Sequence, residues 1–329
     1  MNVGVLGGGA WGTVLAQLAA ARGHDVALWE FDAEAAAELA RDRKNARSTP
    51  AFHLDAKIAV TNDLVAAVRE REVIVVVVPS DTVRATMMAA APGLRAGTVV
   101  VCASKGLEPE THLTMADVLA QAAPGTRVAL LSGPSFAQEI AEGKPAALVT
   151  ASRDATANEA VIAALAGERF RLYTSDDVTG VALGGALKNV IAIAVGCSDG
   201  FGFGMNARAA LMTRGLAEMS RLAVKLGAHP LTLAGLAGFG DLVLTCTGEL
   251  SRNRRVGLAL ARGEQVPAIL ATLGHVAEGI GTARTARALA DELGVDLPIT
   301  RAVATVLHDG KTAREAVGEL LSRDVRAER

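Results

Sequence analysis

The stretch that most restricts the fold is Val73–Val78, an unbroken run of valine and isoleucine that ends at Pro79-Ser80. β-branched side chains favour extended backbone, and a run with no polar position leaves no face for water. The run therefore predicts a central parallel strand that is buried on both faces. Such a strand needs helices on either side of its sheet, which indicates the α/β class.

Similar apolar runs recur through the first half of the chain, separated by helical patterns. They are Val3–Leu6, Asp25–Trp29, Thr98–Cys102, Arg127–Leu131, Ala146–Ala151 and Phe170–Tyr173. Strands that alternate with helices predict a doubly wound, mostly parallel sheet, whose ligands bind beyond the carboxyl ends of the strands. Between them, the polar segment Lys44–Asp55 predicts a loop, and Asp63 predicts an N-cap for the next helix.

The first of these runs ends in Gly7-x-Gly9-x-x-Gly12, and a helical pattern follows. In that context Gly7 suits a tight turn, Gly9 leaves room for a pyrophosphate, and Gly12 lets helix and strand pack closely. The next run ends at Glu30, where a carboxylate can bind the adenosine ribose. The pattern predicts dinucleotide binding, and the alternative is a glycine turn that only joins a strand to a helix. Because Glu30 repels a 2′-phosphate and Phe31 adds no cation, NAD is favoured over NADP.

Polar residues also follow two other predicted strands. Lys105 lies just after Thr98–Cys102, while Gly133 and Ser135 lie just after Arg127–Leu131. Their position at the carboxyl ends of strands makes them candidates for a ligand site. The plainer alternatives are an exposed loop lysine and an ordinary rigid turn.

Strand-like runs disappear after Asp177, and helical patterns continue to the end of the chain. The predicted division is a dinucleotide-binding domain over residues 1–177 and an all-helical domain over residues 178–329. Helices are expected in the second domain at Asn206–Leu226, Thr232–Leu236, Arg252–Arg262, Val266–Leu273, Thr282–Leu293 and Arg301–His308, besides the run that contains Lys188.

Lys188 and Asn189 interrupt the otherwise apolar run Leu183–Val195. Burial disfavours the ammonium form and would lower the pKa of an unpaired lysine, so such a residue suits proton transfer. The alternatives are a lysine that extends to solvent or pairs with a structural carboxylate. The run is nearly long enough to span a bilayer, but the central Lys-Asn pair and the glycines argue against a membrane span.

Two later segments suit charged ligands. The glycine-rich Gly235–Asp241 predicts a tight turn that brings Asp241 near a cation, or else a helix-capping aspartate. Ser251, followed by three arginines among Arg252–Arg255, marks a helix start. Free N–H groups, the helix dipole and arginine forks together predict a phosphate site there, the alternative being a solvated surface patch.

Composition excludes several function classes. A net charge of −2 and a pI near 6.3 give no general attraction to nucleic acid or membrane surfaces. The three cysteines are far apart and lack metal-ligand spacing, so neither a disulfide framework nor a metal site is expected, and Cys102 and Cys197 fit buried apolar positions. No basic leader precedes the first strand, which favours the cytoplasm.

Taken together, the motifs resemble those of bacterial NAD(P)-dependent glycerol-3-phosphate dehydrogenases over almost the whole chain. The matching segments are Gly7–Gly12, Val78–Ser80, Ser104–Gly106, Ser132–Ala137, Gly185–Asn189, Asn206–Leu211, Gly238–Leu242, Thr245-Cys246, Ser251–Arg255 and Glu278-Gly279. The resemblance implies a Rossmann-type sheet followed by an all-α C-terminal domain. It also implies hydride transfer between NAD(P)H and dihydroxyacetone phosphate, which yields sn-glycerol 3-phosphate.

The resemblance also assigns residues to roles. The implied catalytic residues are Lys188, as proton donor and acceptor, with Asp241, Lys105 and Asn189. The implied substrate-binding residues are Lys105, Gly133, Ser135, Lys188, Asp241, Ser251, Arg252 and Asn253. Besides the three glycines, the cofactor positions are Ala10, Trp11, Glu30, Phe31, Lys105, Ala137, Arg252, Val276 and Glu278.

The chain departs from the family pattern at two positions. Phe31 replaces the usual arginine, which agrees with the preference for NAD inferred from Glu30, although NADP use stays open. Ala182 stands where a glutamate is expected before the Lys188 run, which affects how the lysine is held.

Two other functions remain as alternatives. A 3-hydroxyacid dehydrogenase of the 6-phosphogluconate type shares the domain plan, but it carries its asparagine one turn after the lysine, where this chain has Ala192. A non-catalytic NAD(H)-sensing module would have no use for a buried lysine, a facing carboxylate and a phosphate cluster together. The expected partner is a small phosphorylated triose, and a homodimer through the apolar helical domain is compatible with the sequence.

Overall fold

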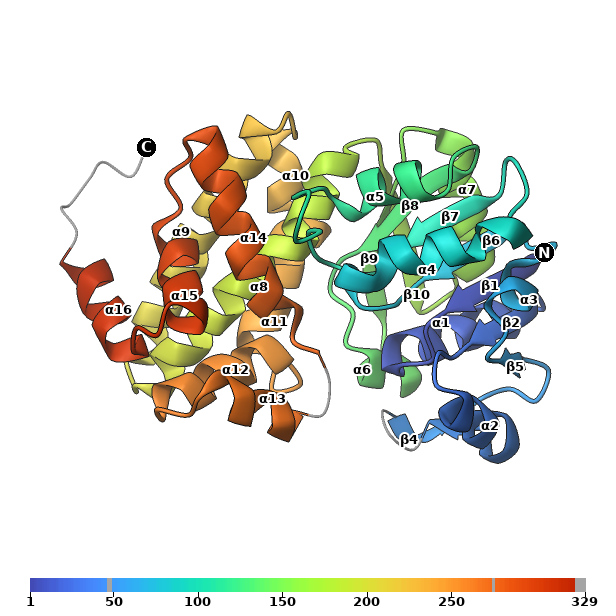
Figure 1. The fold of residues 1–329 in the computed structure, drawn as a ribbon, viewed down its shortest axis with the longest axis horizontal. Helices are drawn as coiled ribbons and strands as arrows, with labels where there is room; N and C mark the ends of the chain where they lie inside the picture. The colour runs from blue at the N-terminus through green and yellow to red at the C-terminus, as the bar shows by residue number, and fades with distance from the viewer. Residues whose placement is uncertain (46–48, 274–275, 323–329) are drawn as a thin grey trace. The chain divides into compact units, whose positions relative to one another are not determined.

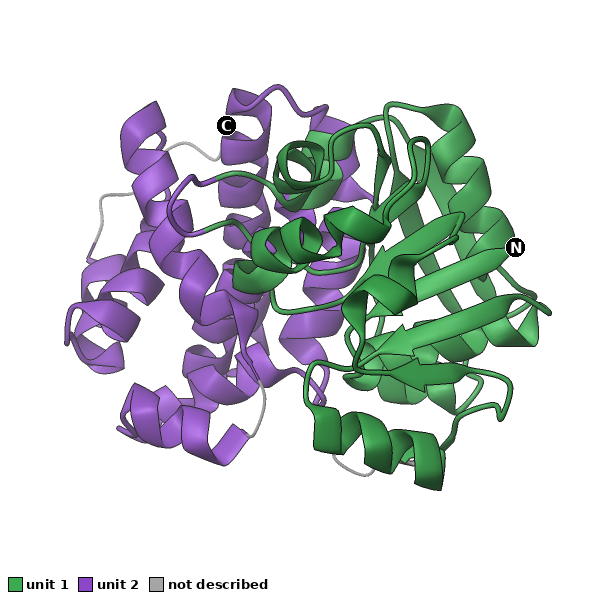
Figure 2. Ribbon diagram, turned by 45° about the vertical axis from the view of Figure 1, so that its right-hand side comes forward, with its two compact units in different colours: residues 1–108, 113–182 green, residues 109–112, 183–329 purple. Residues whose placement is uncertain are grey.

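The computed structural model describes residues 1–45, 49–273 and 276–322 of the chain. The chain folds into two compact units (Figure 2). The first unit comprises Met1–Glu108 and Leu113–Ala182, and the second comprises Pro109–His112 and Leu183–Arg329. The first is an α/β unit built on a sheet, and the second consists of packed helices (Figure 1).

The first unit contains an eight-stranded sheet in the order β10-β9-β8-β7-β6-β1-β2-β5. Its strands are β1 Asn2–Leu6, β2 Asp25–Trp29, β5 Ala59–Thr61, β6 Val73–Val76, β7 Val99–Cys102, β8 Arg127–Ser132, β9 Ala146–Ala151 and β10 Phe170–Ser175. All neighbours are parallel except β8 and β9, which are antiparallel. The predicted doubly wound, mostly parallel sheet is confirmed, and each predicted apolar run forms one of its strands.

Successive side chains of the central strands point to opposite faces of the sheet, and because both sets are apolar, both faces have to be covered by other elements. Val75 and Val101 belong to an apolar core that they share with α1 and α7, while Ile74 and Val100 are equally buried and point to the opposite face. The helices of this unit are α1 Ala10–Ala21, α2 Ala33–Asp42, α3 Leu64–Val68, α4 Val83–Ala90, α5 Met115–Ala122, α6 Ala137–Ala141 and α7 Ala155–Leu165. Asp63 caps α3 as predicted, since its carboxylate accepts from the Ala66 N–H.

The predicted loop at Lys44–Asp55 is wrong in part. Lys44–Asn45 (β3) and Thr49–His53 (β4) pair as a small antiparallel sheet, and residues 46–48 lie outside the described residues. Polar side chains do not exclude a strand whose stability comes from backbone hydrogen bonds and anchoring. Here the Leu54 N–H donates to the Arg43 carbonyl at 2.8 Å, next to the end of α2.

The second unit is helical throughout its described residues, as predicted (Figure 1). It contains α8 Val178–Gly200, whose first turn belongs to the first unit, and then α9 Gly204–Lys225, α10 Pro230–Ala234, the π-helix η3 Leu236–Gly240, α11 Asp241–Thr247, α12 Arg252–Ala261, α13 Val266–Leu273, α14 Glu278–Leu293, α15 Pro298–His308 and α16 Ala313–Leu321. The short α11 and the terminal α16 had no sequence prediction. The predicted tight turn at Gly235–Asp241 is instead η3 followed by the start of α11.

Helix α8 forms the core of the second unit because small residues let other helices approach its backbone. A Cβ on Gly257 of α12 would lie 2.1 Å from the Ile193 carbonyl oxygen, and one on Gly215 of α9 would lie 2.4 Å from the Ile191 side chain. By length and composition α8 could cross a membrane, but 83% of its most apolar window is buried inside the protein. This burial is typical of a core helix.

Half-buried His308 at the end of α15 makes stability depend on pH. Its Nε2 lies 2.9 Å from the Ile280 carbonyl and its Nδ1 lies 2.9 Å from the Arg284 guanidinium, so the neutral ring donates through Nε2 and accepts through Nδ1. Burial lowers the pKa of His308 below its usual value of 6.5, and Arg284 adds to the lowering while the Ile280 carbonyl opposes it.

We therefore expect the free energy of unfolding to fall as the pH is lowered from about 7 through the folded-state pKa, because the unfolded state binds the proton more tightly. Urea unfolding between pH 7.5 and 5.5 should show a smaller pH dependence for His308→Gln than for the unchanged protein. His53→Gln, which replaces an exposed histidine, should keep the full dependence. An equal slope for His308→Gln would contradict the assignment.

Candidate functional site

The glycine turn after β1 tolerates no side chains at two of its positions. Gly7 has a φ of +120°, and a Cβ there would lie 2.8 Å from the Val77 carbonyl oxygen. A Cβ on Gly12 would lie only 1.9 Å from the Gly7 carbonyl oxygen. These two glycines bring the start of α1 directly against the end of β1, as the motif predicts.

Gly9 lies at the open side of this turn, where a Cβ would meet no atom within 4 Å. It is the N-cap of α1 and has no side chain to cap the helix, so the first N–H groups of α1 remain available to a ligand. The indole Nε1 of Trp11 is also buried without a hydrogen-bond partner among the described residues. The free N–H groups at this open helix N-terminus fit the pyrophosphate of a dinucleotide.

Glu30 follows β2 and lies against the same turn. Its Oε2 would be 2.3 Å from a Cβ on Gly8, so the carboxylate covers that glycine. Phe31 is 82% exposed and contacts only Trp29 edge-on among the aromatic rings described. The structure therefore places a carboxylate, with no cation from Phe31, where the sequence predicts contact with the adenosine ribose.

Lys105, Gly133 and Ser135 come together because β7 and β8 are parallel neighbours whose carboxyl ends share one edge of the sheet. Lys105 Nζ donates to the Gly133 carbonyl at 2.8 Å and to Ser135 Oγ at 3.2 Å. Ser135 Oγ in turn donates to the same carbonyl at 2.9 Å. The lysine is half-buried and held by β8, unlike an ordinary loop lysine. Ala137, another predicted position, begins α6 just beyond.

In the second unit, Lys188 forms a buried ion pair. Its Nζ lies 2.5 Å from Asp241 Oδ1 and donates to Thr245 Oγ1 at 2.8 Å. The side chains of Lys188 and Asp241 are only 8% and 1% exposed. Asp241 compensates a charge that would otherwise be costly in the interior. Thr245 had no predicted role, although it lies four residues after Asp241 and hence on the same face of α11.

The Lys188–Asp241 pair is positioned by close packing of the two backbones one helical turn before these residues. A Cβ on Gly184 of α8 would lie 2.6 Å from the Ala237 carbonyl oxygen, so only glycine permits the approach of η3. Lys188 and Asp241 each follow these residues by four positions, about one helical turn. The π-helix, closed by Gly240 N–H to the Gly235 carbonyl, widens the turn just before Asp241.

Asn189 starts a second buried chain of contacts. Its Oδ1 accepts from Asn253 Nδ2 at 2.8 Å, and Asn253 Oδ1 accepts from the Gly279 N–H at 3.0 Å. A Cβ on Gly279 would lie 2.7 Å from both the Asn189 carbonyl oxygen and Asn253 Oδ1. The two amides thus join α8, the start of α12 and the start of α14. Glu278 begins α14, and Val276, also predicted to meet the cofactor, is 49% exposed.

The start of α12 differs from the predicted three-arginine phosphate cluster. Ser251 is the N-cap as predicted, since its Oγ accepts from the Arg254 N–H. The Arg254 guanidinium, however, lies 2.8 Å from Asp199 Oδ2, and Arg208 lies 2.9 Å from Asp199 Oδ1. Arg254 therefore ties α12 to α8, and its charge is compensated. Arg252 in the first turn is exposed and remains a candidate for phosphate.

All three cysteines are free thiols. Cys102, Cys197 and Cys246 are all buried, as expected for the first two. Burial raises the pKa of the Cys197 and Cys246 thiols to about 12, so they stay protonated. Among the described residues, no three His, Cys, Asp or Glu side chains group as metal ligands.

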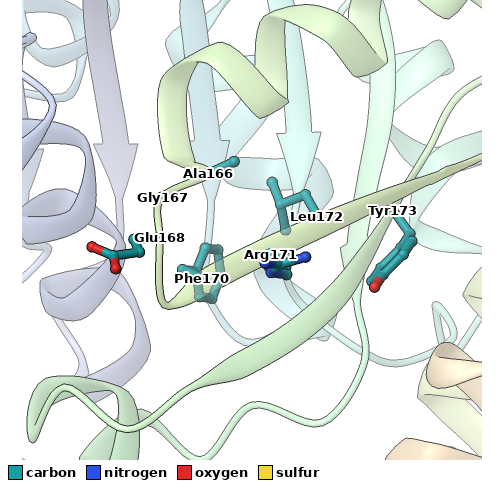
Figure 3. Close-up of a pocket in the computed structure, with 7 residues that line it drawn as sticks. All are labelled: Ala166, Gly167, Glu168, Phe170, Arg171, Leu172 and Tyr173. Atoms are coloured by element: carbon teal, nitrogen blue, oxygen red, sulfur yellow. The ribbon is translucent and has the colours of Figure 1, made fainter.

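A surface pocket lies at the end of α7 and along β10, lined by residues 166–168 and 170–173 (Figure 3). β10 is an edge strand of the sheet, and none of the predicted site residues lines this pocket. The chemistry-bearing residues belong instead to the strand ends and helix starts described above and to the middle of α8.

Two family models match the chain, NAD-dependent glycerol-3-phosphate dehydrogenase N-terminus over residues 2–158 and NAD-dependent glycerol-3-phosphate dehydrogenase C-terminus over residues 177–318. The chain belongs to the NAD-dependent glycerol-3-phosphate dehydrogenase family. The resemblance inferred from the sequence motifs is thereby confirmed, and with it NAD or NADP as the cofactor of the family.

Relatives within the family match over their full length. Glycerol-3-phosphate dehydrogenase [NAD(P)+] of Geobacter metallireducens is 50% identical, with 100% of this chain and 99% of that protein covered. The protein of the same name from Anaeromyxobacter dehalogenans is 48% identical, with complete coverage of both chains. A crystal structure of glycerol-3-phosphate dehydrogenase from Coxiella burnetii has a TM-score of 0.95 at 39% identity and covers 98% of this chain and 99% of that one.

Gly279 provides a test of the close packing around Asn189. Gly279→Ala should lower the free energy of unfolding by about 1–3 kcal/mol, because the new Cβ has to displace the backbone at Asn189. Gly281→Ala is the matched control, since a Cβ two residues further along α14 meets nothing within 4 Å and alanine is the better helix former. Chemical denaturation should separate the two variants, and equal stabilities would contradict this packing.

Proposed function

We propose that this chain catalyses the reversible reduction of dihydroxyacetone phosphate to sn-glycerol 3-phosphate with NAD(P)H. The observation that carries the proposal is the buried Lys188–Asp241 pair, 2.5 Å apart, in a chain of this dehydrogenase family. A buried ammonium with a compensating carboxylate is suited to give a proton to a carbonyl oxygen on which negative charge develops.

We assign the cofactor to the first unit, as the dinucleotide-binding domain. The bound cofactor supplies hydride chemistry, and the chain supplies binding and orientation. The free N–H groups at the start of α1 would hold the pyrophosphate, with Gly9 giving it room. Glu30 would bind the ribose hydroxyls. The family resemblance supports Trp11, Ala137, Arg252, Val276 and Glu278 as further contacts.

We assign proton transfer to the second unit. Lys188 Nζ would donate the proton to the carbonyl oxygen of the triose and take it back in the reverse direction. Asp241 pairs with the lysine ammonium, and the Thr245 hydroxyl fixes where the Nζ points. The Asn189 carboxamide oxygen is bound to Asn253, and one N–H of its NH₂ group donates to the Gly185 carbonyl at 3.4 Å, so its orientation is set and the second N–H would be the donor to the substrate.

The phosphate of the substrate needs a cation that a ligand can reach. Arg252 fits this role because it is exposed in the first turn of α12, where the N–H groups add to its charge. Asn253 would act mainly through its contact with Asn189. Lys105 and Ser135 of the first unit are assigned to the substrate as well, with Gly133 as the residue that holds them together. Binding the remote phosphate would orient the reacting carbon.

The proposed role in metabolism follows from the product. sn-Glycerol 3-phosphate is the backbone precursor of glycerophospholipids, so the enzyme would supply phospholipid biosynthesis. The cytoplasm is the proposed location, which the burial of most of α8 inside the protein supports. A homodimer is proposed only from the apolar composition of the helical domain.

Adding dihydroxyacetone phosphate to the purified protein with NADH, and following NADH absorbance, tests the activity directly. A 3-keto acid serves as the control substrate for the hydroxyacid dehydrogenase alternative. NADH binding without consumption would favour the sensing module.

Lys188→Met should lower kcat by about a thousandfold or more, because the proton donor is lost, while NADH still binds. Since this change leaves Asp241 buried without its partner, the single variant is also expected to be less stable. The double variant Lys188→Met/Asp241→Asn removes that charge and should recover stability without recovering turnover. A double variant with kcat within tenfold of the unchanged protein would show that Lys188 is not the proton donor.

Cofactor preference is the second test. We expect kcat/KM to be about tenfold or more higher with NADH than with NADPH, because the Glu30 carboxylate repels a 2′-phosphate. Glu30→Gln/Phe31→Arg should reduce or reverse this ratio. Glu34→Gln, which removes a nearby exposed carboxylate on α2, is the control and should leave the ratio unchanged. A preference for NADPH in the unchanged protein would overturn the assignment of Glu30.

A further inference from the structure

Asn45, in the small β3–β4 sheet, contacts the glycine turn of the first unit. Its Nδ2 donates to the Gly8 carbonyl at 2.6 Å and to Thr13 Oγ1 at 3.0 Å. Asn45 is only 9% exposed and Thr13 is fully buried. A polar side chain from a short surface hairpin therefore reaches into the turn that precedes α1.

The hydrogens of these two side chains can be assigned. The Asn45 amide has two N–H donors, and both are used, one on Gly8 and one on Thr13. Because the Thr13 hydroxyl accepts from Asn45, its single proton is left for a carbonyl. The nearer one is that of Gly9, at 2.8 Å, with that of Gly8 at 3.2 Å. Asn45 and Thr13 together thus supply donors to the carbonyls of both Gly8 and Gly9.

This arrangement determines which groups the turn offers to a ligand. The carbonyls of Gly8 and Gly9 accept hydrogen bonds from the buried side chains of Asn45 and Thr13. The N–H groups at the start of α1 are then left for an anion, and no carbonyl lone pair repels it. If Asn45 were absent, the Gly8 carbonyl would keep only the longer contact from the Thr13 hydroxyl, at 3.2 Å, and would be less firmly held.

We propose that Asn45 is a positioning residue for the dinucleotide, which orients the glycine turn so that its N–H groups meet the pyrophosphate. The proposal rests on the proposed use of NAD(P)H at this turn. Asn45 would not touch the reacting atoms, and it would affect every ligand that carries the pyrophosphate by the same factor. The small β3–β4 sheet is then part of the cofactor site and not merely a surface connection.

The same segment is fastened to α1 at a second point, which provides a control. The Asp55 N–H donates to Gln17 Oε1 at 2.8 Å, two turns further along α1 than the glycine turn. Gln17→Ala weakens the attachment of the segment but removes no contact with Gly8, Gly9 or Thr13. It therefore separates the contact of Asn45 with the turn from general anchoring of the segment.

The test measures binding directly. For Asn45→Ala, the dissociation constants of NADH, NADPH and ADP-ribose, from fluorescence titration and competition, should all rise by about tenfold, since the Gly8 carbonyl loses its hydrogen bond from Asn45 and Thr13 loses a second one. Asn45→Asp should weaken binding more, because its carboxylate cannot donate to Gly8 and repels the pyrophosphate. Thr13→Val, which keeps the shape but loses the hydroxyl, should give a smaller rise, and it remains informative if the Asn45 variants unfold. For Asn45→Ala, kcat at saturating NADH and the KM for dihydroxyacetone phosphate should stay within about twofold.

Three results would overturn the proposal. The first is that the dissociation constants of Asn45→Ala stay within twofold of those of the unchanged protein. The second is that Gln17→Ala loses as much affinity for the dinucleotides as Asn45→Ala does. The third is that the dissociation constant of Asn45→Ala rises for NADH but not for ADP-ribose. Because binding is measured without turnover, the outcome is distinguishable from a failure of the proposed dehydrogenase activity, which would appear only in the assay with dihydroxyacetone phosphate.

Discussion

A lysine ammonium and an aspartate carboxylate share the interior of the helical unit, and much of that unit is arranged to hold them. Neither charge is tolerable there alone, because removing one partner of a buried pair leaves an uncompensated charge worth several kcal/mol. The Lys188–Asp241 distance of 2.5 Å depends on how closely η3 approaches α8 at Gly184. A larger residue at that position would separate the helices and weaken the pair one turn further on.

Glycine serves a similar purpose at several contacts of α8. Gly257, Gly215 and Gly279 bring α12, α9 and α14 onto the same helix at separations that no Cβ would permit. The buried amides of Asn189 and Asn253 then join three of these elements through hydrogen bonds. The result is a rigid support for side chains whose chemistry requires fixed positions. Asp199 adds to it by holding Arg254 and Arg208 to the end of α8.

In the first unit the candidate cofactor site is formed mainly by backbone groups, whereas the candidate site in the second unit is formed mainly by side chains. The glycine turn offers the N–H groups at the start of α1. The carbonyls that could repel an anion accept hydrogen bonds from Asn45 and Thr13. Lys105 is likewise held by a carbonyl and a hydroxyl of the next strand end. In both places the parallel sheet does the positioning, because the carboxyl ends of its strands lie along one edge.

The amino-acid sequence by itself determined the class of fold, seven of the eight strands of the main sheet, the glycine turn with Glu30, and the family, because each rests on local periodicity or on a motif of fixed spacing. It also singled out Lys188, since an amine in an apolar run is conspicuous. Only the tertiary structure decided which partners meet: Thr245 with Lys188, Arg254 with Asp199 instead of a free phosphate site, and Asn45 with the glycine turn. These contacts join residues that lie 37 to 57 positions apart, and local spacing carries no information about such distances. The packing of whole helices and strands determines these contacts. The close approaches in that packing depend on glycines, and the sequence does not show which residues those glycines meet.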